Sequence, residues 1–226
     1  DENWNQFDFS GFDVVFHVAG IAHIKETKKN KDLYYKVNRD LAIETALKAK
    51  ESKVKQFIFL STMSVYGKET GVITKETIPN PKTTYGKSKY EAELKIRSLS
   101  TNDFITTILR PPMIYGDNSP GNYQRLRRFA LKILFYPKVY NKRSMLDVNK
   151  LSEYVDEYIM KEKDGIFFPQ DNEYGNTTKI MDEARIESGK KSRAVRFIAP
   201  FVFILYPFSK SIRKIFGTLI YEEKQK

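Results

Sequence analysis

Residues 57–67 read Phe-Ile-Phe-Leu-Ser-Thr-Met-Ser-Val-Tyr-Gly, and residues 84–89 read Thr-Tyr-Gly-Lys-Ser-Lys. The four apolar residues at the start predict a buried strand, and the polar residues after it predict a loop. If a helix begins near Tyr85, the Tyr85 phenol and the Lys89 ammonium share one face, because they stand one helical turn apart. The same face continues as an apolar stripe that would hold the helix against a sheet: Ala92, Ile96 and Leu99.

The pairing of Tyr85 with Lys89 indicates proton transfer. A phenol is a poor acid at neutral pH, with an ordinary pKa of about 10. A nearby ammonium stabilises the phenolate, so we predict that Lys89 lowers the pKa of Tyr85. A hydroxyl from the preceding loop, Thr62 or Ser64, would hydrogen-bond the same substrate oxygen. The predicted chemistry is proton exchange with an alcohol or carbonyl, coupled to hydride transfer.

Strands and helices alternate along the first half of the chain. Apolar runs predict strands at 14–18, 57–60 and 104–109, and helical patterns lie between them, at 38–52 and from Tyr85 onward. This alternation predicts an α/β fold with a doubly wound, Rossmann-like parallel sheet. Ligands of such sheets lie beyond the carboxyl ends of the strands, where Ala19 and Gly20 would let a cofactor approach the backbone.

Composition restricts the class of protein. The chain has 226 residues, no cysteine, two histidines and a formal charge of +11. Disulfides and cysteine-ligated metal sites are therefore impossible, and we expect no metal site built on His17 and His23. The basic residues are scattered and no nucleic-acid module is recognisable, so we expect no nucleic-acid partner. The lack of thiols and of a signal sequence favours a cytoplasmic location.

The Tyr-x-x-x-Lys pair, together with Ser61-Thr62-Met63-Ser64-Val65-Tyr66-Gly67 upstream, resembles the extended short-chain dehydrogenase/reductases, the NAD-dependent epimerase/dehydratase family. The resemblance points to the subgroup of nucleotide-sugar 4-epimerases and hexulose 4-reductases. It implies catalysis by Tyr85, Lys89 and Thr62, NAD or NADP as cofactor, a nucleotide sugar as substrate and a homodimer.

Further matches extend the resemblance along the chain. The stretch Arg-Pro-Pro-Met-Ile-Tyr-Gly at 110–116 resembles the family segment that borders nicotinamide and sugar, and Arg143 resembles an arginine that contacts the nucleotide diphosphate. Asn38 resembles an asparagine that ties strands together, although a simple helix N-cap explains it equally well. The resemblance assigns cofactor binding to Ala19, Gly20, Asn38, Ser61, Tyr85, Lys89 and Pro112, and substrate binding to Ser64, Tyr115, Asn122 and Arg143.

The glycine-rich turn of the family is not found in this sequence. No Gly-x-Gly-x-x-Gly or Gly-x-x-Gly-x-x-Gly occurs, and the resemblance begins near the fourth strand of the family's fold. We therefore expect an N-terminally truncated dinucleotide-binding domain at 1–116 and mainly a substrate-binding lobe with C-terminal helices at 117–226. The truncation leaves open an inactive remnant that binds a nucleotide sugar or a partner.

The residues after Thr62 bear on the reaction. Family members that eliminate water place an Asp and a Glu there, whereas this chain has Met63 and Ser64, which disfavours dehydration. The loop and the C-terminal stretch 216–221 resemble the hexulose reductase subgroup more, and this resemblance implies NAD(P)H-dependent 4-reduction of a UDP-2-acetamido-2,6-dideoxy-4-hexulose in surface polysaccharide synthesis. A UDP-hexose 4-epimerase is the close alternative. The sugar, the choice between NAD and NADP, and the oligomeric state stay open.

Residues 197–208 form a strongly apolar run with two prolines, followed by basic residues. About a dozen residues are too few to span a bilayer, which takes about 20. A membrane-surface helix is one interpretation. We expect instead a buried or partner-covered segment, so peripheral membrane contact is possible but not favoured.

Overall fold

The computed structural model describes residues 4–22, 24, 26–116, 119 and 121–222. They form two units that interleave along the chain. The first unit comprises Asp1–Gly67, Ile78–Pro112 and Asn149–Pro169, and the second comprises Lys68–Thr77, Met113–Val148 and Gln170–Lys226.

The first unit is built on a parallel sheet of four strands. Its order is β1-β2-β4-β8, and each neighbouring pair runs parallel. The two inner strands, β2 and β4, are largely buried, and apart from Gln56, Thr106 and Thr107 they consist of isoleucine, phenylalanine and leucine, as expected for strands covered on both faces. The arrangement confirms the predicted α/β class. The strands are β1 (Val14–His17), β2 (Gln56–Leu60), β4 (Ile105–Leu109) and β8 (Gly165–Phe167).

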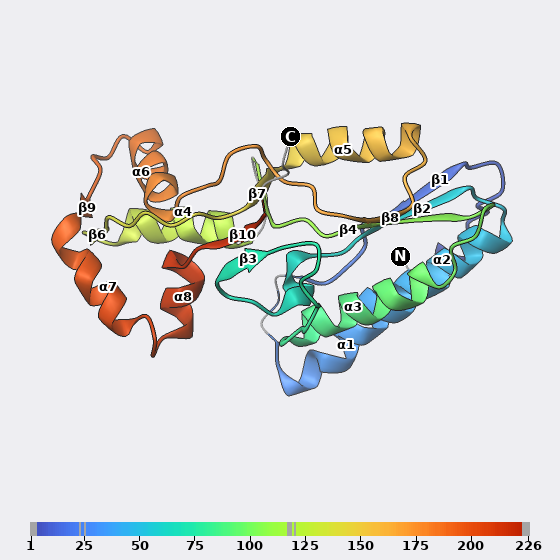
Figure 1. Ribbon diagram of the computed structural model, residues 1–226, viewed down its shortest axis with the longest axis horizontal. Coiled ribbons are helices and arrows are strands. Elements are labelled where there is room, and N and C mark those ends of the chain that lie inside the picture. Colours follow the sequence, from blue (N-terminus) through green and yellow to red (C-terminus); the bar gives the residue numbers. More distant parts are fainter. Residues whose placement is uncertain (1–3, 23, 25, 117–118, 120, 223–226) are drawn as a thin grey trace. The chain divides into compact units, whose positions relative to one another are not determined.

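Helices cover both faces of this sheet (Figure 1). One face carries a continuous helical segment, in which a π-helical turn, η3 (Lys36–Asp40), joins α1 (Lys31–Tyr35) to α2 (Leu41–Glu51), and beside it lies α3 (Thr84–Arg97). The opposite face carries α5 (Val148–Met160). The predicted stripe on α3 is confirmed, since Ala92 and Ile96 are fully buried in the core against β2 and β4 and Leu99 packs on it.

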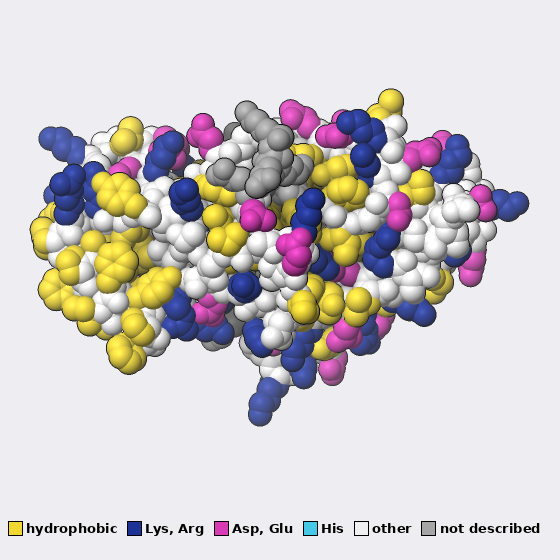
Figure 2. All heavy atoms as spheres, viewed as in Figure 1, with side chains coloured by type: hydrophobic (Ala, Val, Ile, Leu, Met, Phe, Trp, Pro, Cys, Tyr) yellow, Lys and Arg dark blue, Asp and Glu magenta, His cyan; other side chains and the backbone are white. Residues whose placement is uncertain are grey.

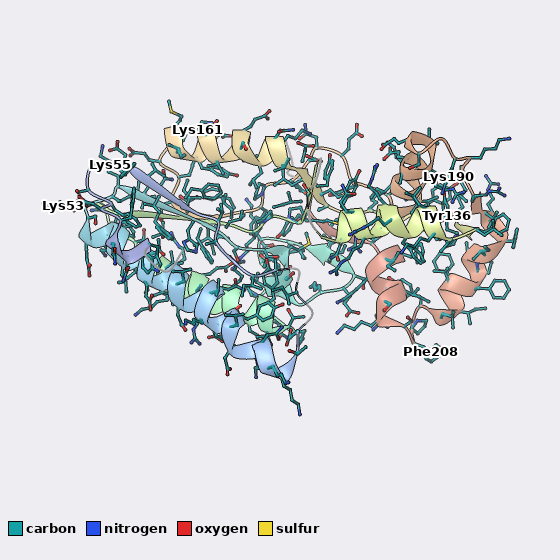
Figure 3. All side chains as sticks on the ribbon, turned by 180° about the vertical axis from the view of Figure 1, so that it is seen from behind. Lys53, Lys55, Tyr136, Lys161, Lys190 and Phe208 are labelled. Atoms are coloured by element: carbon teal, nitrogen blue, oxygen red, sulfur yellow. The ribbon has the colours of Figure 1, made fainter. Side chains whose placement is uncertain are left out.

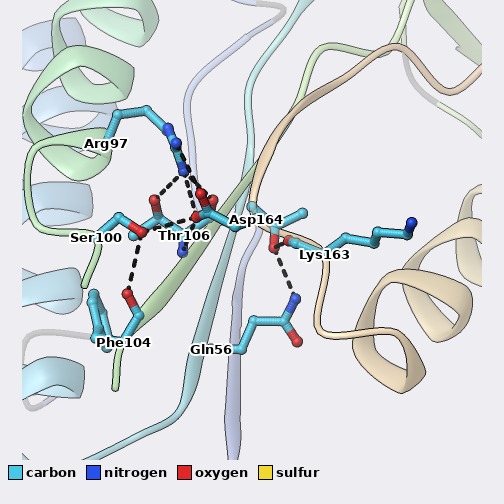
Figure 4. Close-up of polar contacts among 8 residues, drawn as sticks. Gln56, Arg97, Ser100, Phe104, Thr106, Lys163 and Asp164 are labelled. Atoms are coloured by element: carbon cyan, nitrogen blue, oxygen red, sulfur yellow. Dashed lines mark hydrogen bonds and ion pairs between the residues drawn. The ribbon is translucent and has the colours of Figure 1, made fainter. Parts of the chain in front are cut away.

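The amino-terminal end of the sheet is fastened by polar contacts (Figure 4). Arg97 at the end of α3 pairs with Asp164 just before β8 at 2.6 Å. The same carboxylate accepts hydrogen bonds from the Thr106 backbone N–H at 3.1 Å and from the Ser100 hydroxyl at 2.8 Å. The Gln56 amide donates to the Thr107 hydroxyl at 2.8 Å. These contacts fix β4, β8 and α3 at the end of the sheet opposite to the predicted site.

The second unit consists of short strand pairs and helices. Its core contains Ala130, Tyr136 and Met181, which are buried between α4 and α6 (Tyr136 is labelled in Figure 3). Three two-stranded parallel pairs accompany them. The elements are β3 (Gly71–Ile73) with β10 (Leu219–Tyr221), β5 (Met113–Tyr115) with β7 (Met145–Asp147), β6 (Tyr136–Pro137) with β9 (Ala194–Val195), and the helices α4 (Asn122–Lys132), α6 (Thr177–Glu187), α7 (Ala199–Leu205) and α8 (Lys210–Phe216).

Two sequence-based details differ from the structure. The helix predicted at 38–52 begins at Lys31, so Asn38 lies inside a helical segment and is not an N-cap. The two units do not divide at residue 116, because Asn149–Pro169, with α5 and β8, belongs to the first unit, where β8 pairs with β4.

The described residues contain neither a helix that could span a membrane nor a cluster of metal-ligating side chains. None of the described helices is both long enough and apolar enough to traverse a bilayer. Within the same residues, no three His, Asp or Glu side chains are grouped so that they could hold a metal ion. His17 is buried, and burial together with the Lys89 charge lowers the pKa of His17 to about 4. The imidazole is therefore neutral at pH 7, and His23 lies outside the described residues.

Candidate active site

The loop after β2 presents Thr62 at the carboxyl end of the sheet. The Ser61 backbone N–H donates to the Leu109 carbonyl at 2.7 Å, and the Met63 N–H donates to the Pro111 carbonyl at 2.8 Å. These bonds continue the pairing of β2 with β4 past the end of both strands. The Thr62 hydroxyl oxygen accepts the Ser64 N–H at 3.1 Å and so caps the short helix η4 (Met63–Tyr66).

The helix that carries Tyr85 begins at this loop. The Thr83 hydroxyl caps α3 by accepting the Gly86 N–H at 3.1 Å. The Glu26 carboxylate also accepts the Thr84 N–H at 3.1 Å, which suits a negative group at a helix N-terminus. A Cβ on Gly86 would lie only 2.7 Å from the Ser64 carbonyl oxygen. Only glycine therefore lets α3 approach the loop this closely.

Tyr85 and Thr62 are brought together. A hydrogen bond with the Thr62 side chain lowers the pKa of the Tyr85 phenol, but burial has the larger effect and raises the pKa above its ordinary value. The phenol is therefore protonated at neutral pH. In this state it is a hydrogen-bond donor and a potential acid for a substrate oxygen.

Lys89 lies one turn further along α3 and is 3% exposed. Its ammonium donates to the Leu60 carbonyl at 2.8 Å and lies 4.5 Å from the centre of the Phe59 ring. Burial lowers the pKa of Lys89 to about 8, although the charge of Glu93 opposes the shift. The prediction that Lys89 lowers the pKa of Tyr85 is not supported, since the ammonium is directed to the end of β2 and the phenolate is disfavoured by burial.

Asn38 joins the turn after β1 to the helix of Tyr85. Its side-chain oxygen accepts the Ile21 N–H at 2.7 Å, and its amide donates to the Ile21 carbonyl at 2.9 Å and to the Ser88 hydroxyl at 3.3 Å. A Cβ on Gly20 would lie 3.0 Å from the Asn38 oxygen and 3.2 Å from the Lys89 nitrogen. Gly20, Asn38 and Lys89 therefore form one group at the carboxyl end of β1 and β2.

The other predicted cofactor residues of the first unit follow the ends of its strands. Ser61 comes directly after β2 and Pro112 lies three residues after β4, and both are buried, whereas Ala19 is exposed in the turn after β1. Ser64 lies within η4, with its carbonyl against Gly86. The structure thus places every predicted catalytic or cofactor residue at the carboxyl edge of this sheet.

A buried ion pair that sequence reasoning missed supports this edge. Arg110 donates to the Glu93 carboxylate at 2.6 Å and to the Tyr66 phenol at 2.8 Å, and both ion-pair side chains are almost fully buried. Glu93 stands four residues after Lys89 on the same face of α3, which was the only available signal. The contacts link the end of β4, the helix of Tyr85 and the loop of Thr62, so these residues position the site.

A second missed group fastens the segment after β1. The Tyr34 phenol donates to the Ile24 carbonyl at 2.7 Å, while Glu26 accepts from the backbone and the hydroxyl of Thr84. Burial and the charge of Glu26 raise the pKa of Tyr34. The turn that follows β1 is therefore fixed to the start of α3 independently of Asn38.

The three predicted substrate residues of the second unit, Tyr115, Asn122 and Arg143, differ from one another in burial and in hydrogen-bond partners. The Tyr115 phenol donates to the Asp171 carboxylate at 2.7 Å, and burial followed by this bond raises the pKa of Tyr115. Asn122 is exposed at the first position of α4. The Arg143 guanidinium donates to the Gly217 carbonyl at 3.1 Å, and burial lowers its pKa. No carboxylate among the described residues forms an ion pair with Arg143, so its charge is available to an anion.

The parallel sheet and the Tyr85–Lys89 helix define the class of protein, an α/β protein of the short-chain dehydrogenase/reductase type. The family described as "NAD dependent epimerase/dehydratase family" matches residues 2–148. The chain therefore belongs to this family, which confirms the resemblance seen in the sequence.

Two curated relatives resemble this chain in sequence. It is 31% identical over 188 residues to a UDP-glucose 4-epimerase of Vibrio cholerae, which covers 78% of this chain and 57% of the relative. It is 30% identical over 151 residues to the N-acetyl-alpha-D-glucosaminyl-diphospho-ditrans,octacis-undecaprenol 4-epimerase of Escherichia coli O157:H7, which covers 65% of this chain and 45% of the relative. The chain thus spans about half the length of these relatives.

Two solved structures share the fold. A UDP-glucuronic acid 4-epimerase from Bacillus cereus in complex with NAD has a TM-score of 0.71 at 19% identity, over 95% of this chain and 67% of that chain. MoeE5 in complex with UDP-glucose and NAD has a TM-score of 0.71 at 16% identity, over 98% of this chain and 75% of that chain. At these identities the likeness establishes the Rossmann-like fold alone.

Proposed function

We propose that this chain carries the catalytic residues of an enzyme that uses a nicotinamide dinucleotide to oxidise and reduce C4 of a UDP-hexose, with 4-epimerisation as the net reaction. The observation that carries the proposal is the position of Tyr85 next to Thr62 and one helical turn from the buried Lys89, at the carboxyl edge of a parallel sheet. The relatives named as sugar 4-epimerases support the choice of C4.

The roles of the three residues follow from their surroundings. Tyr85, protonated at neutral pH, gives a proton to the developing C4 oxygen during reduction and takes one back during oxidation. Thr62 hydrogen-bonds the same oxygen and orients it, with Ser64 as the second candidate. Lys89 holds the dinucleotide.

The residues at the strand ends fit the nicotinamide end of a dinucleotide. Gly20 offers backbone without a side chain, and Lys89 and Tyr85 offer hydrogen-bond donors. Ala19, Asn38, Ser61 and Pro112 complete the proposed cofactor set. When bound, the dinucleotide supplies a hydride acceptor and donor for C4. Either NAD or NADP satisfies this requirement.

The second unit is proposed to hold the nucleotide sugar. Arg143 is the strongest candidate for the diphosphate, because it is a half-buried guanidinium bonded to a carbonyl rather than to a carboxylate. Tyr115 and Asn122 are proposed to contact the sugar or the uridine. The functional division between a dinucleotide-binding unit and a substrate-binding unit belongs to the same proposal, as do a homodimer and a cytoplasmic location.

Single 4-reduction of a UDP-4-hexulose is the second candidate. It is favoured by the loop Ser61-Thr62-Met63-Ser64 and by the stretch 216–221, which resemble the hexulose reductases. The two reactions differ in cofactor use. An epimerase returns the hydride to the same sugar and consumes no NADH, whereas a reductase oxidises one NADH for each sugar reduced.

Product analysis separates the candidates. The chain is incubated with NAD and UDP-glucose or UDP-N-acetylglucosamine, and separately with NADH and a UDP-2-acetamido-2,6-dideoxy-4-hexulose, and the sugars are resolved by proton NMR. Interconversion of C4 epimers without net change in NADH absorbance supports 4-epimerisation. Stoichiometric NADH loss with the keto sugar supports 4-reduction instead. If the folded chain does neither with any of the three sugars, both proposals fail and a binding remnant is the better description.

A further inference from the structure

The C-terminal part of the second unit exposes an apolar surface. Helix α7 buries Val202 alone among its residues, while the rest of its bulky side chains face solvent. Figure 2 shows hydrophobic side chains gathered over α7 at the left of the view. Of the two alternatives expected for this segment, buried or partner-covered, burial within this chain is therefore excluded for these side chains. We call this surface the apolar face; it consists of Phe197, Phe201, Phe203, Ile204, Leu205 and Phe208, each more than half exposed.

The apolar face is comparable in area to the largest apolar patch of a typical monomer. If a phenylalanine offers roughly 200 Å², the four phenylalanines together present on the order of 500 Å². A patch of this size is often functional. Scattered exposed apolar residues need no such explanation, but these belong to one short segment of the chain.

The apolar face is held in place by specific contacts. The Arg213 guanidinium donates to the Pro207 carbonyl at 2.7 Å and to the Glu69 carboxylate at 3.1 Å. The Ser209 hydroxyl accepts the Ile212 N–H at 3.3 Å and caps α8. These bonds fix the turn between α7 and α8, from which Phe208 projects away from both helices (Figure 3). Phe208 is 86% exposed although its turn is well bonded.

The segment that carries the apolar face has charged side chains of one sign. Between residues 188 and 221 the sequence holds seven lysines and arginines and no aspartate or glutamate. Glu69 pairs with Lys210 and Arg213. Among the described residues, no carboxylate forms an ion pair with any of the remaining five: Lys190, Lys191, Arg193, Arg196 and Lys214.

We propose that the apolar face with its basic border docks on an anionic lipid bilayer. Exposed phenylalanines and a leucine on short helices, flanked by basic residues and without acidic ones, match the features of segments that lie in the membrane interface. The rings would enter the headgroup region while the lysines and arginines contact lipid phosphates. The face is too short to span the bilayer, so the contact is peripheral.

The charges favour a membrane over a second copy of the chain. A two-fold contact would place the same basic border on both sides of the interface, where like charges repel. A bilayer with anionic lipids supplies the opposite charge over its whole surface. This inference does not depend on the proposed reaction, because docking can be measured without turnover.

Vesicle flotation tests the inference. The chain is mixed with vesicles of phosphatidylcholine alone or with roughly one-third phosphatidylglycerol, at low and high salt. We expect binding to the anionic vesicles, weakened at least about tenfold without anionic lipid and reduced by salt. Replacement of Phe201, Phe203 and Phe208 by Ser should raise the lipid concentration for half-binding at least about tenfold.

Matched variants distinguish binding through the apolar face from non-specific binding through any exposed apolar or basic side chain. Met160→Ser and Ile78→Ser remove side chains of similar exposure from the first unit, and Lys163→Glu reverses an exposed charge there. These should leave binding unchanged, whereas Arg196→Glu with Lys214→Glu should weaken it at least about tenfold. Circular dichroism confirms folding of each variant. No binding, equal binding by the phenylalanine variant, or a dimer that this variant abolishes would overturn the proposal.

Discussion

The Lys89 ammonium donates a hydrogen bond to the backbone carbonyl of Leu60, the last residue of the inner strand β2, at 2.8 Å. A buried lysine with a carbonyl as its nearest partner costs free energy, and burial accordingly lowers its pKa from 10.5 to about 8. A residue that destabilises the fold and lies beside Gly20 and the Tyr85 helix is expected to serve binding rather than stability.

Lys89→Met should therefore raise the melting temperature at pH 7 while removing dinucleotide binding. Because the folded pKa is lower than the unfolded one, the unfolded chain binds more protons between about pH 8 and pH 10.5. The contribution of Lys89 to stability is thus unfavourable below this window and improves as pH rises through it. The advantage of the methionine variant should shrink toward pH 10.5. Scanning fluorimetry across this range measures it, and a lower melting temperature of the variant at pH 7 would contradict the account.

Tyr85→Phe should reduce turnover with the active substrate by at least about a hundredfold and leave the fold intact. The phenol is the acid, and its raised pKa keeps it protonated at neutral pH. Thr62→Val should cause a smaller loss, because it removes one hydrogen bond and leaves the proton donor. Steady-state rates and circular dichroism are compared with Tyr90→Phe, a half-buried tyrosine of the same helix. Equal loss in the control would mean that the phenol at 85 has no special role.

In the buried Glu93–Arg110 ion pair, removal of either side chain alone should destabilise the protein, because the other charge is then buried without a partner. Arg110→Met leaves an unpaired buried carboxylate and should cost about 3–5 kcal/mol of the free energy of unfolding. Arg110→Met with Glu93→Leu should recover part of this loss. Urea denaturation of Arg110→Met, Glu93→Leu and the double variant gives the interaction free energy between the two side chains. Additive losses would show that the two side chains act separately.

Gly86→Ala should destabilise the protein although alanine favours helices by about 1 kcal/mol. The new Cβ would lie 2.7 Å from the Ser64 carbonyl oxygen, a backbone atom that moves only with the η4 loop. We expect a loss of about 1–3 kcal/mol and a lower turnover, because the loop carries Thr62. Urea denaturation shows whether Gly86→Ala lowers or raises the free energy of unfolding. A more stable variant would show that α3 and the loop are not in close contact.

The sequence predicted the elements of the first unit because their patterns are local. Alternation of apolar runs with helical faces placed β1, β2, β4 and α3, and the spacing of Tyr85 and Lys89 gave their shared face. The role of Asn38 required the structure, since its partners Ile21 and Ser88 are distant in sequence. The Glu93–Arg110–Tyr66 group is also tertiary, and nothing local indicates which arginine meets a buried carboxylate.

The wrong expectations have physical reasons too. Residues 197–208 were expected to be buried or covered by a partner, because apolar composition normally indicates burial. Their large side chains are not buried in this chain, since composition does not specify which element or partner lies over them. The effect of Lys89 on Tyr85 was inferred from helical spacing, which gives a shared face and not the direction of the ammonium. The return of α5 and β8 to the first unit follows from strand pairing and leaves no compositional boundary.

Isothermal titration of the 226-residue chain with NADH and NADPH, with and without UDP-sugar, tests the central claim most directly. The account predicts saturable micromolar binding of at least one dinucleotide, strengthened by UDP-sugar, lost in Lys89→Met and retained in Lys163→Glu. Absence of dinucleotide binding by a cooperatively folded chain, or unchanged binding by Lys89→Met, would contradict the assignment of the Gly20, Tyr85 and Lys89 edge as the cofactor site.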